Sequence, residues 1–160
     1  MLFVVVLASC GGQPQSKFKT YAGPPVTQVQ INKGQRVMML FSGNQVLKTY
    51  RINLGNNPVG DKMFEGDGKT PEGVYFIDRF NPNSQYYLSV GISYPDPQDV
   101  AQAEAYGRRP GGDIFIHGQG AEGRAANRPD WTAGCIAITD SEIEDVYSML
   151  RPGVPIIIRP

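Results

Sequence analysis

The only histidine of this chain, His117, and one of its two cysteines, Cys135, stand in settings that suit covalent catalysis. His117 closes the run Asp113–Gly118, which is typical of a strand that delivers an imidazole at its end. Cys135 follows Gly134 in a tight turn that leads into a second apolar run. Attack of sulfur on a carbonyl carbon needs a thiolate, a base beside it and backbone donors for the oxyanion. These residues are therefore candidates for a cysteine–histidine site.

Each of the two residues also has a plainer explanation. A lone cysteine in an apolar stretch is more often a small buried hydrophobic residue than a nucleophile. A lone histidine is more often a satisfied core or surface group than a general base. The two occur together, each beside glycine and a β-like run, which leaves both the catalytic and the structural interpretation open.

Length and composition limit the class of protein. The 160 residues fit one domain, and an apolar fraction of 41% is enough for a core. The 19 glycines and 13 prolines indicate many turns and a β-rich scaffold. A formal net charge of zero gives no bulk attraction for nucleic acid, so we expect no such partner. One histidine and two distant cysteines match no zinc-site spacing, and we expect neither metal nor cofactor.

The N-terminus has the pattern of a bacterial lipoprotein. Residues 1–9 are apolar but too short to cross a bilayer as a helix, and Leu7–Cys10 resembles a lipoprotein processing site with Cys10 as the lipidated residue. We therefore expect a signal peptide over 1–9, a flexible tether over 10–25 and a catalytic domain over 26–160. A signal peptide normally carries Lys or Arg near its start, and this one carries neither. A buried N-terminal strand that ends in an ordinary cysteine is the alternative.

Short strands separated by turn residues follow the tether. The alternation over Val26–Asn32 predicts a half-buried strand, and brief turns to the next two strands favour an antiparallel meander. The glycine-rich stretch Gly55–Gly73 predicts a long loop, which in compact domains is usually functional or disordered. The predicted strands cover residues 26–32, 36–41, 45–54, 73–78, 86–94, 113–118 and 154–158.

Helical signals are few. Thr139 and Glu142 have the spacing of a capping box that opens a helix over Ser141–Leu150. The alanine-rich segment Asp99–Tyr106 favours a second, short helix. Pro155 lies inside the last predicted strand and favours an edge position, because proline donates no hydrogen bond. The predicted fold class is mainly β, with one or two short helices.

The order of the motifs carries a family resemblance. His117-Gly118 is followed by Thr132-Ala-Gly-Cys135, with the cysteine 18 residues after the histidine. This pattern resembles the His-Gly and Ser/Thr-x-Gly-Cys signature of the L,D-transpeptidase catalytic domain (YkuD-like) family, ErfK/YafK type. Further similar segments are Gly66–Gly73, Gly91–Pro95 and Cys135–Asp140. The resemblance covers nearly all of the chain beyond the tether and implies a YkuD-like β-sandwich.

The resemblance also implies roles for single residues. By position Cys135 is the nucleophile and His117 its base, with the backbone carbonyl of Gly118 orienting the imidazole. The backbone amides of Gly134 and Cys135 are the implied oxyanion donors, and Thr132 stands where the family has serine or threonine. A thiolate activated by His117 is expected to react well below the ordinary thiol pKa of about 8.5.

Two positions depart from the family pattern. Ala133 stands where many members have a histidine, and Ala137 stands where many have arginine or asparagine. The second departure removes a polar group near the substrate, so we look to arginines to hold its carboxylate, above all Arg109 and Arg128. A solvated basic loop is the alternative for each. Trp131 either shapes the loop over the site or serves as a packing anchor. The arginines considered are Arg108, Arg109, Arg124 and Arg128.

The resemblance implies a peptidoglycan L,D-transpeptidase that acylates Cys135 with a stem tetrapeptide and transfers the acyl group to an amine. The amine belongs either to a neighbouring stem or to an anchored protein. Two alternatives stay open: a hydrolase on the same scaffold, and a non-catalytic cell-wall-binding module. The expected location is periplasmic, with membrane attachment only through the lipid on Cys10.

Overall fold

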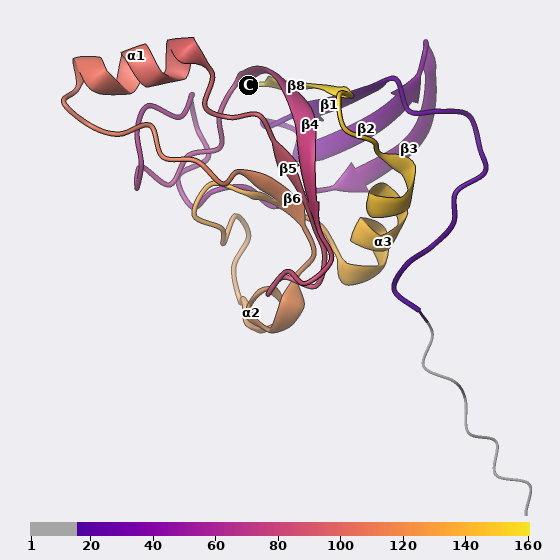
Figure 1. Cartoon of the computed structure of the whole chain (residues 1–160). Coiled ribbons are helices and arrows are strands. Elements are labelled where there is room, and N and C mark those ends of the chain that lie inside the picture. The colour runs from indigo at the N-terminus through magenta and orange to yellow at the C-terminus, as the bar shows by residue number, and fades with distance from the viewer. Residues whose placement is uncertain (1–15) are drawn as a thin grey trace, which may run out of the picture.

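The computed structural model describes residues 16–160 (Figure 1). Three antiparallel strands open the domain: β1 (Gln28–Asn32), β2 (Val37–Ser42) and β3 (Gln45–Arg51). Alternate residues of β1 and β2 are buried, as the period-2 pattern requires. The predicted antiparallel meander is therefore confirmed.

The last strand, β8 (Pro155–Arg159), lies in the middle of the sheet. It pairs in parallel with β1 and antiparallel with β4 (Gly73–Asn81). The edge position predicted from Pro155 is therefore wrong. Pro155 is the first residue of β8, and the parallel pairing to β1 begins only at Ile156, so the missing N–H is tolerated there.

β4 continues into the part of the sheet that holds the site. Its far end pairs with β5 (Ser89–Ile92), which pairs with β6 (Phe115–His117), which pairs with β7 (Ile136–Ala137). Isolated bridges from the segment after β3 to the β7 region, at Asn53–Ala137 and Gly55–Thr132, curl the eight-stranded sheet back on itself. The mainly β prediction is confirmed.

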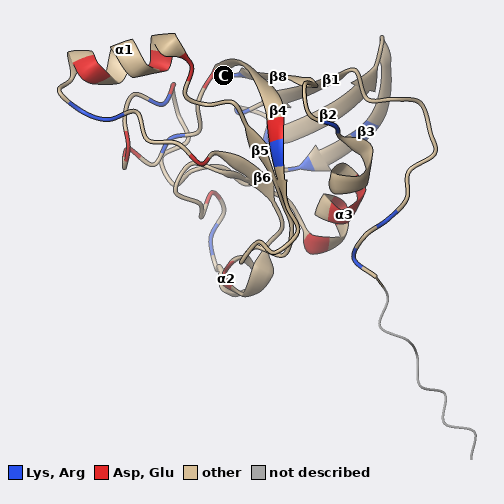
Figure 2. Cartoon of the chain, in the orientation of Figure 1, with Lys and Arg blue, Asp and Glu red and all other residues tan. Residues whose placement is uncertain are grey.

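Three short helices accompany the sheet in the described residues, rather than one or two: α1 (Pro97–Ala105), α2 (Gly120–Ala125) and α3 (Asp140–Met149). Sequence patterns gave no sign of the six-residue α2. The capping box of α3 is present, with Thr139 accepting from the Glu142 amide and Glu142 accepting from the Thr139 amide. Figure 2 shows that charges of both signs are interspersed over the chain, with acidic residues on α1 and α3.

Two buried lysines fix the long loop between β3 and β4. Lys33 Nζ donates to the carbonyls of Gly60 and Thr70 and pairs with Glu72 at 2.8 Å. Lys62 pairs with Asp67 at 2.9 Å. The loop is therefore an ordered wall of the domain.

The described end of the predicted tether packs on the domain. Lys17 Nζ donates to the carbonyl of Pro82, and Lys19 pairs with Asp145 at 2.7 Å on α3. The predicted signal peptide, Cys10 and the rest of the tether as far as residue 15 lie outside the described residues. None of the helices in the part that the structure describes is long and apolar enough to span a membrane.

Candidate active site

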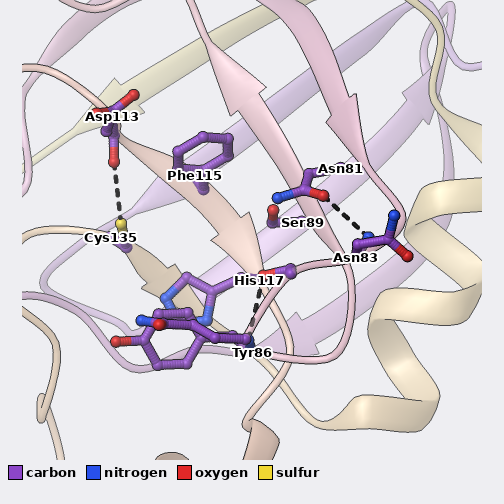
Figure 3. Close-up of a pocket in the computed structure, with 10 residues that line it drawn as sticks. Asn81, Asn83, Tyr86, Ser89, Asp113, Phe115, His117 and Cys135 are labelled. Carbon is purple, nitrogen blue, oxygen red and sulfur yellow. Dashed lines mark hydrogen bonds between the residues drawn. The ribbon is translucent and has the colours of Figure 1, made fainter.

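A parallel strand pair places Cys135 and His117 on one face of the sheet. β6 and β7 pair in the register His117↔Ala137, so Cys135, just before β7, comes opposite Phe115. Side chains alternate along strands, which turns Cys135 and His117 to the same side. Both line a pocket of about 460 Å³. Figure 3 shows the sulfur and the imidazole in this pocket.

His117 is held as a neutral base. Its side chain is only 2% exposed, and its Nδ1 lies 2.6 Å from the carbonyl oxygen of Gly118. Because a carbonyl oxygen can only accept, Nδ1 carries the proton of the neutral ring and Nε2 keeps the free lone pair. Burial lowers the pKa of His117, with the Gly118 carbonyl and the charge of Glu122 opposing the shift. The imidazole is therefore in the form that accepts a proton.

Two aromatic rings hold the imidazole in place. The ring of Tyr86 stacks on His117 with centroids 4.3 Å apart, and Trp131 meets the imidazole edge-on at 5.7 Å. The Tyr86 hydroxyl donates to Glu122 at 3.0 Å, which ties the stack to α2. Trp131 packs beside His117 and is not among the residues that line the pocket, and its predicted role at the substrate stays a prediction.

The sulfur of Cys135 is turned toward Asp113. Its thiol donates to the backbone carbonyl of Asp113 at 3.4 Å (Figure 3), and no hydrogen bond among the described residues joins it to His117. Asp113 itself adopts a left-handed backbone, with φ of 54°. Asp113 and Cys135 also line a second pocket of about 180 Å³. The sulfur therefore lies where two pockets meet.

Burial also sets the protonation of Cys135. It raises the pKa of the thiol, and a backbone hydrogen bond from Phe115 opposes the rise. The free site therefore holds a neutral thiol and a neutral imidazole at pH 7. The expectation of a thiol that ionises well below its ordinary pKa is wrong for this state, because desolvation outweighs the groups that favour the thiolate.

The turn that presents Cys135 is closed by Thr132. The buried Thr132 hydroxyl donates to the carbonyl of Cys135 at 2.7 Å and accepts from the amide of Gly134 at 3.1 Å. The Gly134 amide is thus occupied, so its predicted oxyanion role requires that bond to break. For the amide of Cys135 the described residues supply no partner. Thr132 positions the loop in this structure, and its predicted contact with substrate stays a prediction.

A close backbone approach explains the glycine before the cysteine. Gly134 has φ of 146°, and a Cβ on it would lie 2.8 Å from the carbonyl oxygen of Lys69. Only glycine lets the chain pass the long loop this closely.

Ala133 and Ala137, the two departures from the family pattern, differ in position: Ala133 is exposed on the second pocket, and Ala137 is buried.

The arginines predicted to bind substrate lie away from the larger pocket. Arg109 is 85% exposed and pairs with Glu65 at 2.8 Å, and Arg128 lines a separate depression with Trp131. Neither is among the residues that line the two pockets at Cys135. Their role in substrate binding stays a prediction.

Sequence reasoning missed several residues of the site. The pocket is also lined by polar groups from β4, from β5 and from the turn between these two strands. Their only common signal is strand register, which a single sequence does not show. They are Asn81, Asn83, Ser84, Gln85, Tyr86 and Ser89.

In the described part of the chain, no group of three or more His, Cys, Asp or Glu residues is placed to hold a metal ion.

The family model for YkuD, the L,D-transpeptidase catalytic domain, matches residues 27–158. The chain belongs to this family. YafK of Escherichia coli K12, whose own assignment as an L,D-transpeptidase is provisional, is 29% identical over 151 residues, covering 86% of this chain and 55% of YafK. The family resemblance drawn from the motifs is thus confirmed.

Solved structures agree with this assignment. The helical cell shape determining protein Pgp2 from Campylobacter jejuni superposes with a TM-score of 0.67 at 26% identity, over 87% of this chain and 49% of that one. An L,D-transpeptidase from Mycobacterium smegmatis shares the fold, with a TM-score of 0.56 at 14% identity over 83% of this chain and 58% of that one. The chain spans about half the length of YafK and Pgp2.

Proposed function

We propose that this protein is a peptidoglycan L,D-transpeptidase with Cys135 as nucleophile and His117 as base. The observation that carries the proposal is the place of Cys135 on a wall shared by two pockets, with His117 lining the larger one. Two pockets at one sulfur suit a reaction with two substrates, an acyl donor and an amine acceptor. Membership in the L,D-transpeptidase family supports a transferase in general.

The first half-reaction begins with rotation of the Cys135 thiol from the Asp113 carbonyl toward His117. Nε2 takes the thiol proton as sulfur attacks the carbonyl carbon of the third stem residue, and the Cys135 amide donates to the resulting oxyanion. The tetrahedral adduct collapses when the imidazolium returns that proton to the departing D-alanine amine. A thioester and neutral His117 remain.

In the second half-reaction an amine enters and attacks the thioester. His117 accepts the proton of the amine, and the sulfur leaves and is reprotonated, which restores the starting state. A neutral histidine suits both halves, because it must accept a proton before it donates one. Gly118 contributes by fixing the ring through Nδ1.

The test is incubation of the purified protein with tetrapeptide muropeptides, followed by mass analysis of the products and of the intact protein. Cross-linked dimers and a Cys135 acyl adduct support transfer, and both must vanish in Cys135→Ser. Shortened stems without dimers support the hydrolase alternative, in which water replaces the amine. Full turnover in Cys135→Ser contradicts either reaction.

The remaining expectations join this proposal. A peptidoglycan substrate places the domain outside the cytoplasm, and the acceptor is either a second stem or an anchored protein. Attachment through Cys10 is proposed from the motif alone. Membrane fractionation of Cys10→Ala tests it, since unchanged membrane association would remove the lipoprotein assignment.

A further inference from the structure

One arginine outside the predicted set is aimed at the site. In the register of the sheet, Arg79 of β4 lies opposite Gly91 of β5, and Gly91 lies opposite Phe115 of β6. Phe115 precedes His117 by two residues on the same strand. The Arg79 guanidinium lies 4.6 Å from the centroid of the Phe115 ring. Phe115 lines the larger pocket together with Cys135 and His117. Arg79 therefore reaches across the sheet to the rim of the pocket.

Gly91 makes this path possible. A Cβ on Gly91 would lie 2.5 Å from Cγ of Arg79 and 2.9 Å from its Nε. The stem of Arg79 thus occupies the space that any other residue at position 91 would fill. The side chain lies across Gly91 of β5, and 40% of its surface stays exposed.

The guanidinium already holds a carboxylate that is easily exchanged. Arg79 pairs with Asp78 at 2.7 Å and with Asp113 at 3.3 Å, and the Asp113 side chain is 89% exposed. An exposed ion pair of this kind contributes at most about 1 kcal/mol, because water solvates both partners well. A second carboxylate can therefore take the place of Asp113 at little cost.

Asp113 contacts both the Cys135 thiol and Arg79, the two groups that a substrate would have to contact. Its backbone carbonyl accepts from the Cys135 thiol at 3.4 Å, while its carboxylate contacts Arg79 at 3.3 Å. A stem tetrapeptide has the same pair of groups one residue apart: a scissile carbonyl, and the carboxylate of the terminal D-alanine. The distance from sulfur to guanidinium is thus one that a single residue spans.

The geometry points to Arg79 as the residue that binds the terminal carboxylate of the donor stem peptide, at the seat that the Asp113 carboxylate fills in the free protein. This inference rests on the proposed function and deepens it. It also links binding to chemistry, since a carboxylate that displaces Asp113 from Arg79 frees the residue whose carbonyl holds the thiol. Arg79 is a specificity-determining residue in this assignment.

Two of the other arginines considered for this task form ion pairs elsewhere. Arg109 pairs with Glu65, and Arg124 pairs with Asp140. Neither contacts a residue that lines the larger pocket, whereas Arg79 contacts two, Asp113 and Phe115.

The test compares two probes that differ only at the C-terminus: a stem tetrapeptide with its free carboxylate, and the same peptide as the C-terminal amide. Binding is measured by calorimetry in the Cys135→Ser background, which needs no turnover. We expect the acid to bind up to about 5-fold more tightly than the amide, which is the range for an ion pair with a partly exposed guanidinium. Arg79→Gln should abolish this preference and leave amide binding unchanged.

Three further variants sharpen the result. Arg79→Lys should keep part of the preference, and Asp113→Asn, which removes the competing carboxylate, should increase it. Arg51→Gln, at an exposed arginine of β3 that lines neither pocket at Cys135, is the matched control and should change neither probe. An unchanged acid preference in Arg79→Gln, or an equal loss of both probes, would overturn the inference, because a merely structural role weakens both alike.

Turnover separates this inference from the proposed function. If Cys135-dependent products form and Arg79→Gln keeps the acid preference, the inference fails and the function stands. If no products form but the acid preference depends on Arg79, the carboxylate site stands and the function fails.

Discussion

Burial acts on the two central residues in opposite directions, and this sets the chemistry that they can perform. It lowers the pKa of His117 and raises the pKa of Cys135, so both shifts favour the neutral form. The pair therefore resembles a serine–histidine pair more than a preformed thiolate–imidazolium pair. In the proposed reaction, ionisation of the sulfur is therefore coupled to its attack on the carbonyl carbon.

The first prediction follows from this protonation. The alkylation rate of Cys135 with iodoacetamide should rise only above the pH at which a free thiol ionises, about 8.5. His117→Ala should leave this profile nearly unchanged while it abolishes acyl transfer. The rate is measured by intact mass between pH 6 and 10, with free N-acetylcysteine as the reference. Rapid labelling at pH 6 that depends on His117 would contradict the neutral pair.

The second prediction concerns the acid limb of turnover. His117 must be neutral to accept the thiol proton, and its pKa lies below the ordinary 6.5, so protonation sets in only at lower pH. We expect kcat/KM to be retained at pH 6.5 and to fall as pH drops further. The measurement is kcat/KM for a tetrapeptide substrate as a function of pH. If kcat/KM falls with a midpoint above pH 6.5, another group controls the rate.

Thr132 gives the third prediction at this scale. Its hydroxyl donates to the Cys135 carbonyl and accepts from the Gly134 amide, so Thr132→Val leaves both buried groups without that partner. Loss of about 1–3 kcal/mol in the free energy of unfolding is expected, with lower kcat. Thr132→Ser keeps the hydroxyl and should keep most of both quantities. If Thr132→Val and Thr132→Ser unfold at the same urea concentration, the hydroxyl does not stabilise the turn.

At the scale of elements, one segment clamps the turn that carries Cys135. Asn53 exchanges two backbone hydrogen bonds with Ala137, and the carbonyl of Leu54 accepts from the Thr132 amide on the other side of the cysteine. Asp130 adds a side-chain bond, since its carboxylate accepts from the Leu54 amide at 2.9 Å. The turn is therefore fixed by the chain that leaves β3.

Arg36 completes this clamp and carries the fourth prediction. Its guanidinium holds the Asp130 carboxylate through Nε at 3.0 Å and Nη2 at 2.7 Å. Arg36→Met keeps the side-chain length but should cost about 1.5–3 kcal/mol of unfolding free energy and lower kcat more than it raises KM. Arg51→Met, at an exposed arginine of β3, is the control. A double-mutant cycle with Asp130→Asn should give strong coupling, and additive effects would separate Arg36 from the turn.

The sequence was most informative where one motif lies within one element. The capping box of α3 was predictable because its partners are close in the chain, and the family resemblance implied the contact between His117 and the Gly118 carbonyl. Arg79 was not, because its meeting with Phe115 depends on the register of two strands and on the space above Gly91. Pro155 led to a wrong prediction of an edge strand. It is the first residue of β8, where the missing N–H costs no hydrogen bond to β1.

On the scale of the whole molecule, the long loop between β3 and β4 is a wall of the site rather than a flexible connection. The backbone of Lys69 backs Gly134, and Lys62, Glu65 and Gly66 line the second pocket. The composition of this loop predicted either function or disorder, and the structure favours function. The two buried lysines, Lys33 and Lys62, hold this loop in an ordered conformation, and composition alone does not reveal that they are buried.

The fifth prediction tests whether the loop depends on Lys33. The Lys33 side chain is 2% exposed, and its ammonium group pairs with Glu72 and donates to the carbonyls of Gly60 and Thr70. Lys33→Met therefore leaves three acceptors without their donor. Breaking a buried pair from one side costs about 3 kcal/mol or more, because the remaining groups stay desolvated. We expect faster hydrogen exchange across residues 58–72 and reduced transfer at an unchanged β-sheet signal. Lys48→Met, on an exposed pair with α3, is the control. If the loop exchanges as slowly in Lys33→Met as in the wild type, the wall is held by its backbone contacts and the lysine is dispensable.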